Sequence, residues 1–207
     1  MGGFFCIRFT LKSYAMEPQK QISSIKDLIQ KRRSVFPVQY NGQPLSKEVL
    51  LDVLECANWA PNHKKTEPWR FKVIRGNQLQ ALGEFLSSKY QEVTGQPKQV
   101  KTRKLLENPQ KAGAIIAICM QRDPKESLPL WEEQAAVAMA VQNMWLRCTE
   151  LEIGSYWSSP GLIKYMGEFF ELSAGESCLG FFYMGYTDEP WPESQRGPLA
   201  DKVQWLE

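Results

Sequence analysis

One long helix constrains the fold more than any other stretch of the sequence. The predicted helix over residues 130–152 carries small or apolar residues on nearly every side, at Ala135, Ala136, Ala138, Met139, Ala140, Val141 and Met144. A helix that is apolar all round is buried on more than one side. Its uncharged run, Gln134 to Leu146, falls short of the roughly 20 apolar residues that cross a bilayer. We therefore expect it to pack on a sheet and on a second element, and a dimer interface is one way to supply that element.

A second apolar run predicts the centre of a sheet. Residues 112–120 contain no charge, and their length and composition are typical of a strand buried on both faces. Further strands are predicted at 69–74, 155–157 and 178–185. Helices are predicted at about 22–33, 46–60, 79–86 and 98–107, and another after the Pro160-Gly161 turn. Because strands and helices do not alternate regularly, the order indicates an α+β or α/β mixture rather than a doubly wound fold.

The composition describes an ordinary globular chain. Of 207 residues, 43% are hydrophobic and 23% charged, which excludes disordered, collagen-like and coiled-coil classes. We expect a flexible leader at residues 1–20, with Met16 as an alternative start, and a single domain over residues 21–207. The net charge is only +2, so neither nucleic acid nor a membrane is predicted as a partner.

The cysteines point to a reducing compartment. Their number is odd and no C-x-x-C spacing occurs, which argues against a disulfide framework or a zinc ribbon; they are Cys6, Cys56, Cys119, Cys148 and Cys178. We expect a cytoplasmic protein.

Several chemistries are excluded by what the sequence lacks. His63 is the only histidine, so a multi-histidine metal site is impossible and no metal is predicted. The chain has no G-x-G-x-x-G, no G-x-x-x-x-G-K-[ST] and no G-x-S-x-G, which disfavours Rossmann binding, P-loop phosphoryl transfer and nucleophile-elbow hydrolysis. A cofactor that brings its own reactivity is favoured, because the protein then needs only to bind and orient it.

Two polar clusters could serve such a cofactor. Arg32, Arg33 and Ser34 offer two guanidinium groups and a hydroxyl, the donors that a phosphate monoester requires; the alternative is a solvated helix end favoured by the helix dipole. The loop at residues 60–71 holds His63 and Lys65 beside a predicted buried strand, where functional sites often lie. Its alternative is a loop that merely faces solvent.

A third cluster is aromatic. In the segment 154–161, Tyr156 and Trp157 could wall a planar ring while Ser158 and Ser159 donate hydrogen bonds. The alternative is that both rings belong to the core. Each of the three clusters alone is a weak signal.

Together, in this order, these segments resemble the FMN-dependent nitroreductase family, and in particular its short single-domain members. The resemblance covers about residues 22–205. It rests on five ordered blocks: Arg32-Arg33-Ser34, Ala60-Pro61 through Pro68-Trp69-Arg70-Phe71, the alanine-rich helix running into Gly154, Tyr156-Trp157-Ser158, and the strand 181–186 with Arg196 beyond it.

The resemblance implies an α+β fold of three layers, with a central mixed or antiparallel sheet flanked by helices. It also implies a homodimer with FMN at the subunit interface and NADH or NADPH as the reductant. The cofactor-binding residues it implies are Arg32, Arg33, Ser34, Trp59, His63, Lys65, Trp157, Ser158, Ser159 and Arg196. No residue is implied to be catalytic, because the flavin performs the redox step.

The chain also departs from the family pattern, at Phe36, Lys65 and Glu67. An acidic Glu67 near a reduced flavin would raise the energy of that anion unless a neighbouring basic residue neutralises it.

The predicted activity is NAD(P)H oxidation coupled to reduction of a nitroaromatic, a quinone or a similar electron-poor acceptor. Aromatic residues make up 12% of the chain; we assign Trp59, Trp69, Tyr156 and Trp157 to the flavin segments and Trp131 and Trp145 to the dimer interface. Three alternatives stay open. The first keeps FMN but changes the reaction, since the resembled family includes flavin-destroying and dehalogenating members. The others are a non-catalytic flavin carrier and an interaction module that uses the aromatics around Trp191-Pro192.

Overall fold

The computed structural model describes residues 24–207, so the expected leader at residues 1–20 lies outside the described residues. The helices are α1 (Ile25–Lys31), α2 (Lys47–Asn58), α3 (Asn77–Val93), α4 (Gln99–Lys111) and α5 (Leu130–Glu150). The strands are β1 (Trp69–Ile74), β2 (Ala114–Gln121), β3 (Gly154–Ser158) and β4 (Glu176–Gly185). Short 3-10 helices are η1 (Pro37–Gln39), η2 (His63–Lys65), η3 (Gly161–Glu168) and η4 (Ala200–Lys202).

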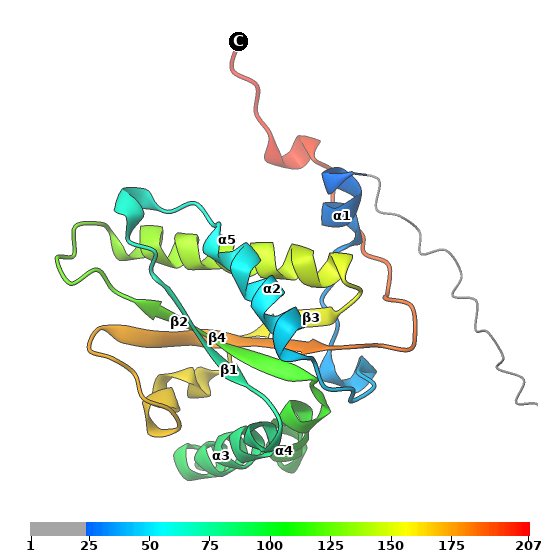
Figure 1. Ribbon diagram of the computed structural model, residues 1–207, viewed down its shortest axis with the longest axis vertical. Coiled ribbons are helices and arrows are strands. Elements are labelled where there is room, and N and C mark those ends of the chain that lie inside the picture. Colours follow the sequence, from blue (N-terminus) through cyan, green and yellow to red (C-terminus); the bar gives the residue numbers. More distant parts are fainter. Residues whose placement is uncertain (1–23) are drawn as a thin grey trace, which may run out of the picture.

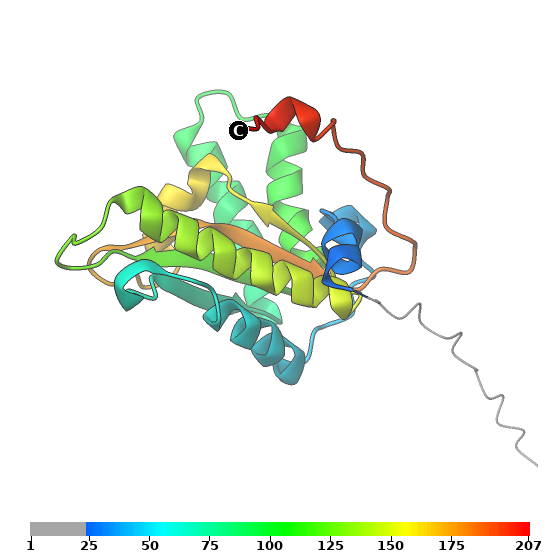
Figure 2. The same cartoon turned by 90° about the horizontal axis from the view of Figure 1, so that it is seen from above.

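The four strands form one antiparallel sheet in the order β1-β2-β4-β3. The mixed or antiparallel sheet expected from the resemblance is thus antiparallel throughout the described chain. Helices cover both faces: α2 and α5 lie on one side, and α3 and α4 on the other (Figures 1 and 2). The α+β architecture with helices on both sides of the sheet is therefore confirmed.

Strand β2 is the central strand that its apolar sequence predicts. Ile116 and Ile118 face the α5 side, and Ile115 and Ala117 face the α3 side. All four are fully buried, because a strand sends alternate side chains to opposite faces and here each face carries a helix layer. Burial on both sides explains why the run lacks polar residues.

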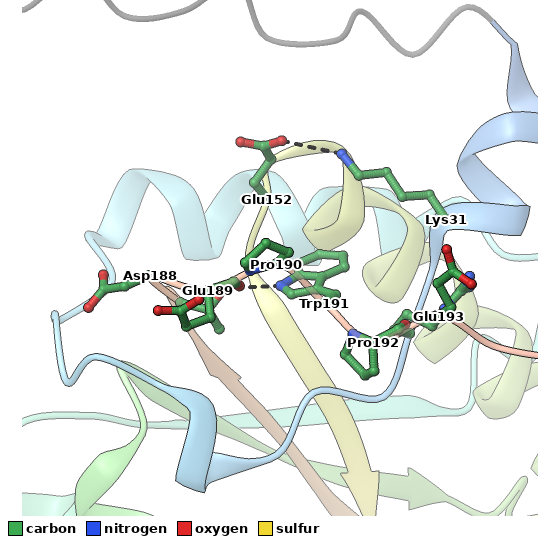
Figure 3. A pocket seen from close by; sticks show the side chains of 10 residues that line it. Lys31, Glu152, Asp188, Glu189, Pro190, Trp191, Pro192 and Glu193 are labelled. Carbon is green, nitrogen blue, oxygen red and sulfur yellow. Dashed lines mark hydrogen bonds and ion pairs between the residues drawn. The ribbon is translucent and has the colours of Figure 1, made fainter.

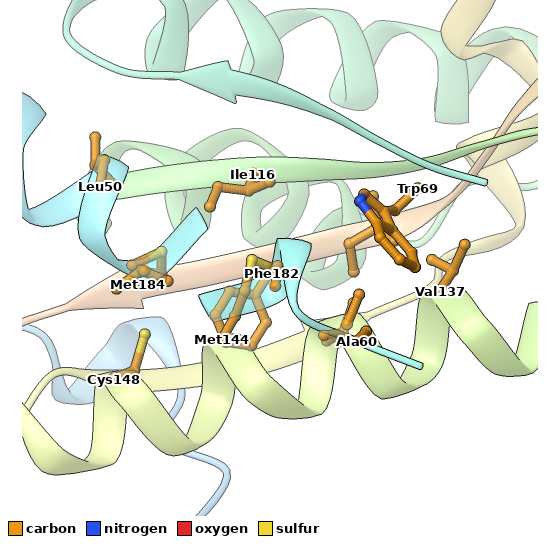
Figure 4. Packing of buried hydrophobic residues seen from close by; sticks show 14 of the residues in the cluster. Leu50, Ala60, Trp69, Ile116, Val137, Met144, Cys148, Phe182 and Met184 are labelled. Atoms are coloured by element: carbon orange, nitrogen blue, oxygen red, sulfur yellow. The ribbon is translucent and has the colours of Figure 1, made fainter. Parts of the chain in front are cut away.

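One hydrophobic core lies between α5 and the sheet (Figure 4). Val137, Met144 and Cys148 of α5 are fully buried and pack with Phe182 and Met184 of β4. Helix α2 packs on a second side of α5. The prediction that α5 is buried on more than one side is therefore confirmed, and α2 supplies the second side.

A third face of α5 stays open in the single chain. Trp131 is 66% exposed and Met139 is 40% exposed, and the small Ala138 between them is exposed as well. By contrast Trp145, which we had also assigned to a dimer interface, is partly buried and meets Phe182 edge to face at 5.6 Å.

Side-chain caps mark the starts of α1 and α2. The hydroxyl of Ser24 accepts a hydrogen bond from the Asp27 amide, and that of Ser46 accepts one from the Val49 amide, as expected for helix N-caps. Ile22 and Ser23, which we placed at the same helix start, lie outside the described residues. The segment after Pro160 is 3-10 rather than α-helical.

One irregularity interrupts the β2–β4 ladder. Ile118 pairs with Gly180, but the next residue, Cys119, pairs with Cys178. Leu179 is therefore the extra residue of a β-bulge on β4. Gly180 has φ +155°, a conformation that side chains rarely adopt.

Candidate functional site

The segment after α1 forms one wall of the site. The indole of Trp145 donates a hydrogen bond to the Arg33 carbonyl (3.0 Å), and the Val35 amide donates to the Ser155 carbonyl (3.0 Å). The Arg32 guanidinium lies 4.6 Å from the centre of the Trp145 ring, a cation–π distance. Helix α5 and strand β3 thus hold Arg32-Arg33-Ser34 in place.

Arg33 fastens the C-terminal tail to this wall. Its Nε donates to the Pro192 carbonyl (3.0 Å), and its Nη1 donates to the carbonyls of Gln30 and Arg32. Pro192 lies four positions before Arg196, so this contact brings the tail back beside α1. Figure 1 shows the tail passing α1 after it leaves β4.

The tail, α1 with the segment after it, and α5 line an open cavity of about 790 Å³. Three guanidinium groups and no carboxylate line it; the lining residues are Ile29, Gln30, Arg32, Arg33, Ser34, Gln142, Trp145, Ser194 and Arg196. The pKa of Arg32 is lowered, most of all by its partial burial and then by the positive charges of Arg196 and Arg33. Like charges gathered in this way are relieved by an anion, and guanidinium forks match phosphate oxygens. We call this space the arginine cavity.

A neighbouring pocket has the opposite character (Figure 3). It measures about 490 Å³ and shares Arg33 with the arginine cavity, but it also holds the carboxylates of Glu152, Asp188, Glu189 and Glu193. Its other cation, Lys31, is paired with Glu152 at 3.2 Å. Four carboxylates against two basic side chains disfavour a phosphate, so the arginine cavity is the better anion site.

The loop with His63 lies at the other end of α5. The Nδ1 of His63 is 2.7 Å from a carboxylate oxygen of Glu132, and Lys64 donates to the Ser127 carbonyl at 2.8 Å. Lys64, Lys65 and Glu67 all have positive φ, which is uncommon for side-chain-bearing residues and tends to occur at functional sites. The loop is held to the start of α5 by these two contacts.

Trp59 is a surface residue. It is 79% exposed, and its indole donates to Glu55 at 3.0 Å. Trp69, which we had grouped with the flavin segments, is only 6% exposed and its indole donates to Asn58 at 3.2 Å. Trp69 thus belongs to the core, because it stands at a position of β1 that faces α2 and α5.

The idea that Tyr156 and Trp157 wall one ring together is wrong. Successive strand residues point to opposite faces: Tyr156 stacks on Tyr183 at 5.0 Å on the α3 side, while Trp157 packs on the α5 side. The Trp157 indole lies against Gly180: a Cβ added at Gly180 would stand 2.2 Å from the indole nitrogen Nε1. The buried N–H of this indole has no hydrogen-bond partner among residues 24–207. Ser158 ends β3 and Ser159 follows it on the exposed surface.

The predicted site residues therefore fall into separate places in one chain. Arg32, Arg33, Ser34 and Arg196 meet at the arginine cavity. His63 contacts Glu132, whereas the Arg33 segment contacts Trp145, thirteen positions further along α5. At 1.5 Å per residue these two contacts are about 20 Å apart.

Sequence reasoning missed three side chains that the site uses. Gln142 and Trp145 line the arginine cavity from one face of α5, and Glu132 contacts His63 from the first turn of the same helix. The spacing of three residues between Gln142 and Trp145 places them on one face. That spacing alone could not show which neighbour the face meets.

Other site types lack support in the described part of the chain. Between residues 24 and 207, histidine, cysteine, aspartate and glutamate side chains nowhere gather in a group of three that could hold a metal ion. Over the same residues, none of the helices has the length and apolar character needed to span a membrane.

Known proteins resemble this chain over most of its length. Residues 29–186 match the sequence model described as the Nitroreductase family. The chain is 29% identical over 189 residues to "Putative NAD(P)H nitroreductase YfhC" of Bacillus subtilis, covering 88% of this chain and 94% of that protein.

Solved structures share the fold. The nitroreductase-like family protein of Bacillus cereus has a TM-score of 0.77 and 28% identity, over 89% of this chain and 97% of that one. Oxidised iodotyrosine deiodinase, solved with FMN and 3-iodo-L-tyrosine, has a TM-score of 0.66 and 21% identity, over 88% and 98%. Since the family match spans well over half of the sequence and includes the Arg32-Arg33-Ser34 segment, both central strands and α5, the chain belongs to the nitroreductase family.

Proposed function

We propose that the protein is an FMN-dependent oxidoreductase that uses NADH or NADPH to reduce nitroaromatic, quinone or similar electron-poor acceptors. The observation that carries the proposal is the arginine cavity, where Arg32, Arg33 and Arg196 converge without a carboxylate. A phosphate monoester is the part of FMN that such a donor set suits. Iodotyrosine deiodinase, which shares the fold, was solved with FMN, and this supports the same cofactor here.

The residues of the cavity have distinct parts in this proposal. Arg32 and Arg196 pair with the phosphate, and the exposed hydroxyl of Ser34 hydrogen-bonds to the phosphate or the ribityl chain. Arg33 donates three hydrogen bonds to backbone carbonyls, one of which lies in the tail. Its main part is thus to bring Arg196 to the cavity.

The remaining predicted residues serve the flavin ring. Trp157, Ser158 and Ser159 form one wall, and Trp59, His63 and Lys65 lie on the exposed α2–β1 connection. When bound, FMN supplies the hydride-accepting and hydride-donating centre. The protein side chains orient it and place positive charge near the ring, and water supplies the protons, so we propose no catalytic acid or base.

A homodimer would bring the arginine cavity of one chain close to the His63 loop of the other. Within one chain the His63 loop is about 20 Å from the arginine-cavity wall. Trp131, Ala138 and Met139 leave an apolar face of α5 open between these ends. We propose that two chains pack on this face, so that the loop of one protomer completes the cavity of its partner. Exposed apolar patches of this kind mark interaction surfaces.

The alternatives lead to different results in one experiment. The interaction-module alternative relies on Trp191, but that indole is half-buried and donates to Thr187 at 3.0 Å.

The decisive measurement is anaerobic titration of the FMN-loaded protein with NADH and, separately, NADPH. We expect the visible flavin absorbance to bleach with at least one of them, and to return when a quinone is added.

Two results would contradict the proposal. A protein that binds no FMN would support an interaction module. A yellow protein that neither nicotinamide reduces would support a flavin carrier.

A further inference from the structure

Two cysteines face each other across the centre of the sheet. Cys119 of β2 is the direct partner of Cys178 on β4. Paired residues on antiparallel strands have Cα atoms about 4.5–5.5 Å apart. A disulfide spans Cα distances of about 4.4–6.8 Å, so two cysteines paired directly across antiparallel strands lie within disulfide range.

The β-bulge creates the pair. Because Ile118 pairs with Gly180, an uninterrupted register would place Leu179 opposite Cys119. The extra residue shifts the register by one, and such a shift exchanges the faces of the side chains. Cys119 and Cys178 consequently share the face covered by α3 and η3.

The two thiols affect each other's ionisation. Cys119 lowers the pKa of the Cys178 thiol, and Cys178 together with burial raises the pKa of Cys119. Cys178 also lies 3.6 Å from the Gly180 carbonyl. Close by, Lys72 pairs with the buried carboxylate of Glu176 at 2.8 Å. Lys72 favours the thiolate form of both cysteines, and Glu176 disfavours it.

We propose that Cys119 and Cys178 form a reversible disulfide when the protein meets hydrogen peroxide. Cys178 is the residue that reacts first, because it is 7% exposed whereas Cys119 is fully buried. Hydrogen peroxide is little larger than water, so it suits a thiol with so little exposed surface. The inference does not rest on the proposed flavin activity.

The chemistry needs no further reactant. The Cys178 thiolate attacks one peroxide oxygen, an S–O bond forms as the O–O bond breaks, and hydroxide leaves and takes a proton to become water. Cys119 then attacks the resulting sulfenic acid, the S–S bond forms, and the S–O bond breaks to release a second water. Two thiols are oxidised and one peroxide is reduced to two waters. A dithiol reductant reverses the bond by exchange.

The other described cysteines act as internal comparisons. Cys148 is fully buried on the α5 side, and burial raises its pKa. Cys56 is partly exposed on α2, but burial and Asp52 raise its pKa. Neither stands opposite another cysteine in the sheet. We expect both to remain thiols at a peroxide dose that closes the pair.

The test uses the full-length protein and mass spectrometry. Labelling with a maleimide after denaturation gives five additions to the reduced chain, since it has five cysteines. After peroxide we expect three additions and a cross-linked peptide that joins Cys119 to Cys178. A dithiol reductant should restore five.

Variants identify the order of the steps. In C119S, we expect dimedone to trap a sulfenic acid at Cys178; in C178S, we expect neither the cross-link nor an adduct at Cys119. The matched control C56S should still lose two labelling sites. Five additions in the wild type after peroxide, a cross-link between other cysteines, or sulfinic acid at Cys178 without a cross-link would each overturn the proposal. Because peptide mapping of the wild type decides the matter alone, an unfolded variant does not obstruct the test.

Discussion

Arg196 is the most informative side chain for testing the arginine cavity. Its hydrogen bonds stay within the tail, to Ser194 and to the Gln195 carbonyl, and its side chain lines the cavity. Replacing it with glutamine removes one cation from the three while leaving a side chain of similar reach. A charge-assisted hydrogen bond contributes about 1.5–3 kcal/mol. Arg196→Gln is therefore expected to weaken FMN binding by roughly 10- to 150-fold.

The stability of the FMN-free protein should respond differently. An exposed substitution without tertiary contacts changes stability by about 0.5 kcal/mol or less. In addition, the repulsion that helps to lower the pKa of Arg32 is reduced when Arg196 is replaced. The melting temperature without FMN should thus stay the same or rise slightly, although affinity for FMN falls. A residue with a purely structural role would instead lower the melting temperature.

The assay is a titration of FMN fluorescence against the FMN-free protein at low and high salt, with thermal unfolding in parallel. Arg103→Gln is the matched control, because Arg103 is exposed on α4 and only approaches Glu107 at 3.9 Å. Arg196→Lys should fall between wild type and Arg196→Gln, since it keeps the charge and loses the planar fork. Unchanged FMN affinity in Arg196→Gln would refute the assignment of the cavity to the phosphate.

Three further changes test the packing around the site. Gly83→Ala places a Cβ 2.3 Å from the Leu106 carbonyl oxygen. The overpacking cost of about 1–3 kcal/mol should exceed the gain of about 1 kcal/mol in helix propensity. The free energy of unfolding in urea should therefore fall, and an increase would contradict the close packing of α3 on α4. Gly180→Ala meets the Trp157 indole at 2.2 Å at φ +155°, and we expect a loss of at least about 2 kcal/mol in the same assay. Burial raises the pKa of Glu176, but its contacts with Lys72 and the Ser173 amide together outweigh burial and lower that pKa in the folded protein. The stabilisation from this carboxylate is present above the unfolded pKa near 4.5 and is lost as pH falls through the lower folded value, so Glu176→Gln should flatten the acid limb of thermal unfolding, and an unchanged limb would refute this.

Elements with local signals could be predicted from the sequence. Strand β1 has the predicted bounds, and α2 begins after Ser46 as expected, because an N-cap hydroxyl and a side-chain period act over a few residues. Helix α4 extends past the predicted end at residue 107 to Lys111, and it includes Pro109 in its last turn. Pro109 is buried in this turn, although proline disfavours the interior of a helix.

Features that depend on distant partners could not be predicted in this way. The bulge at Leu179 follows from the pairing of β2 with β4, which are more than 50 positions apart. Likewise the contact of Arg33 with Pro192 joins residues 159 positions apart. The resemblance to a known family, rather than local pattern, placed Arg196 with Arg32. The placement of Tyr156 and Trp157 on opposite faces is different, because the alternation of side chains along a strand predicts it from the sequence alone.

The separation of the two residue groups along α5 has a genetic consequence if the proposed homodimer forms. Each of the two sites would draw the arginine cavity from one copy and the His63 loop from the other. A cell carrying one allele defective in the cavity and another defective in the loop would assemble mixed dimers with one site built wholly from intact parts. The two alleles would therefore complement each other, while two alleles defective in the same part would not.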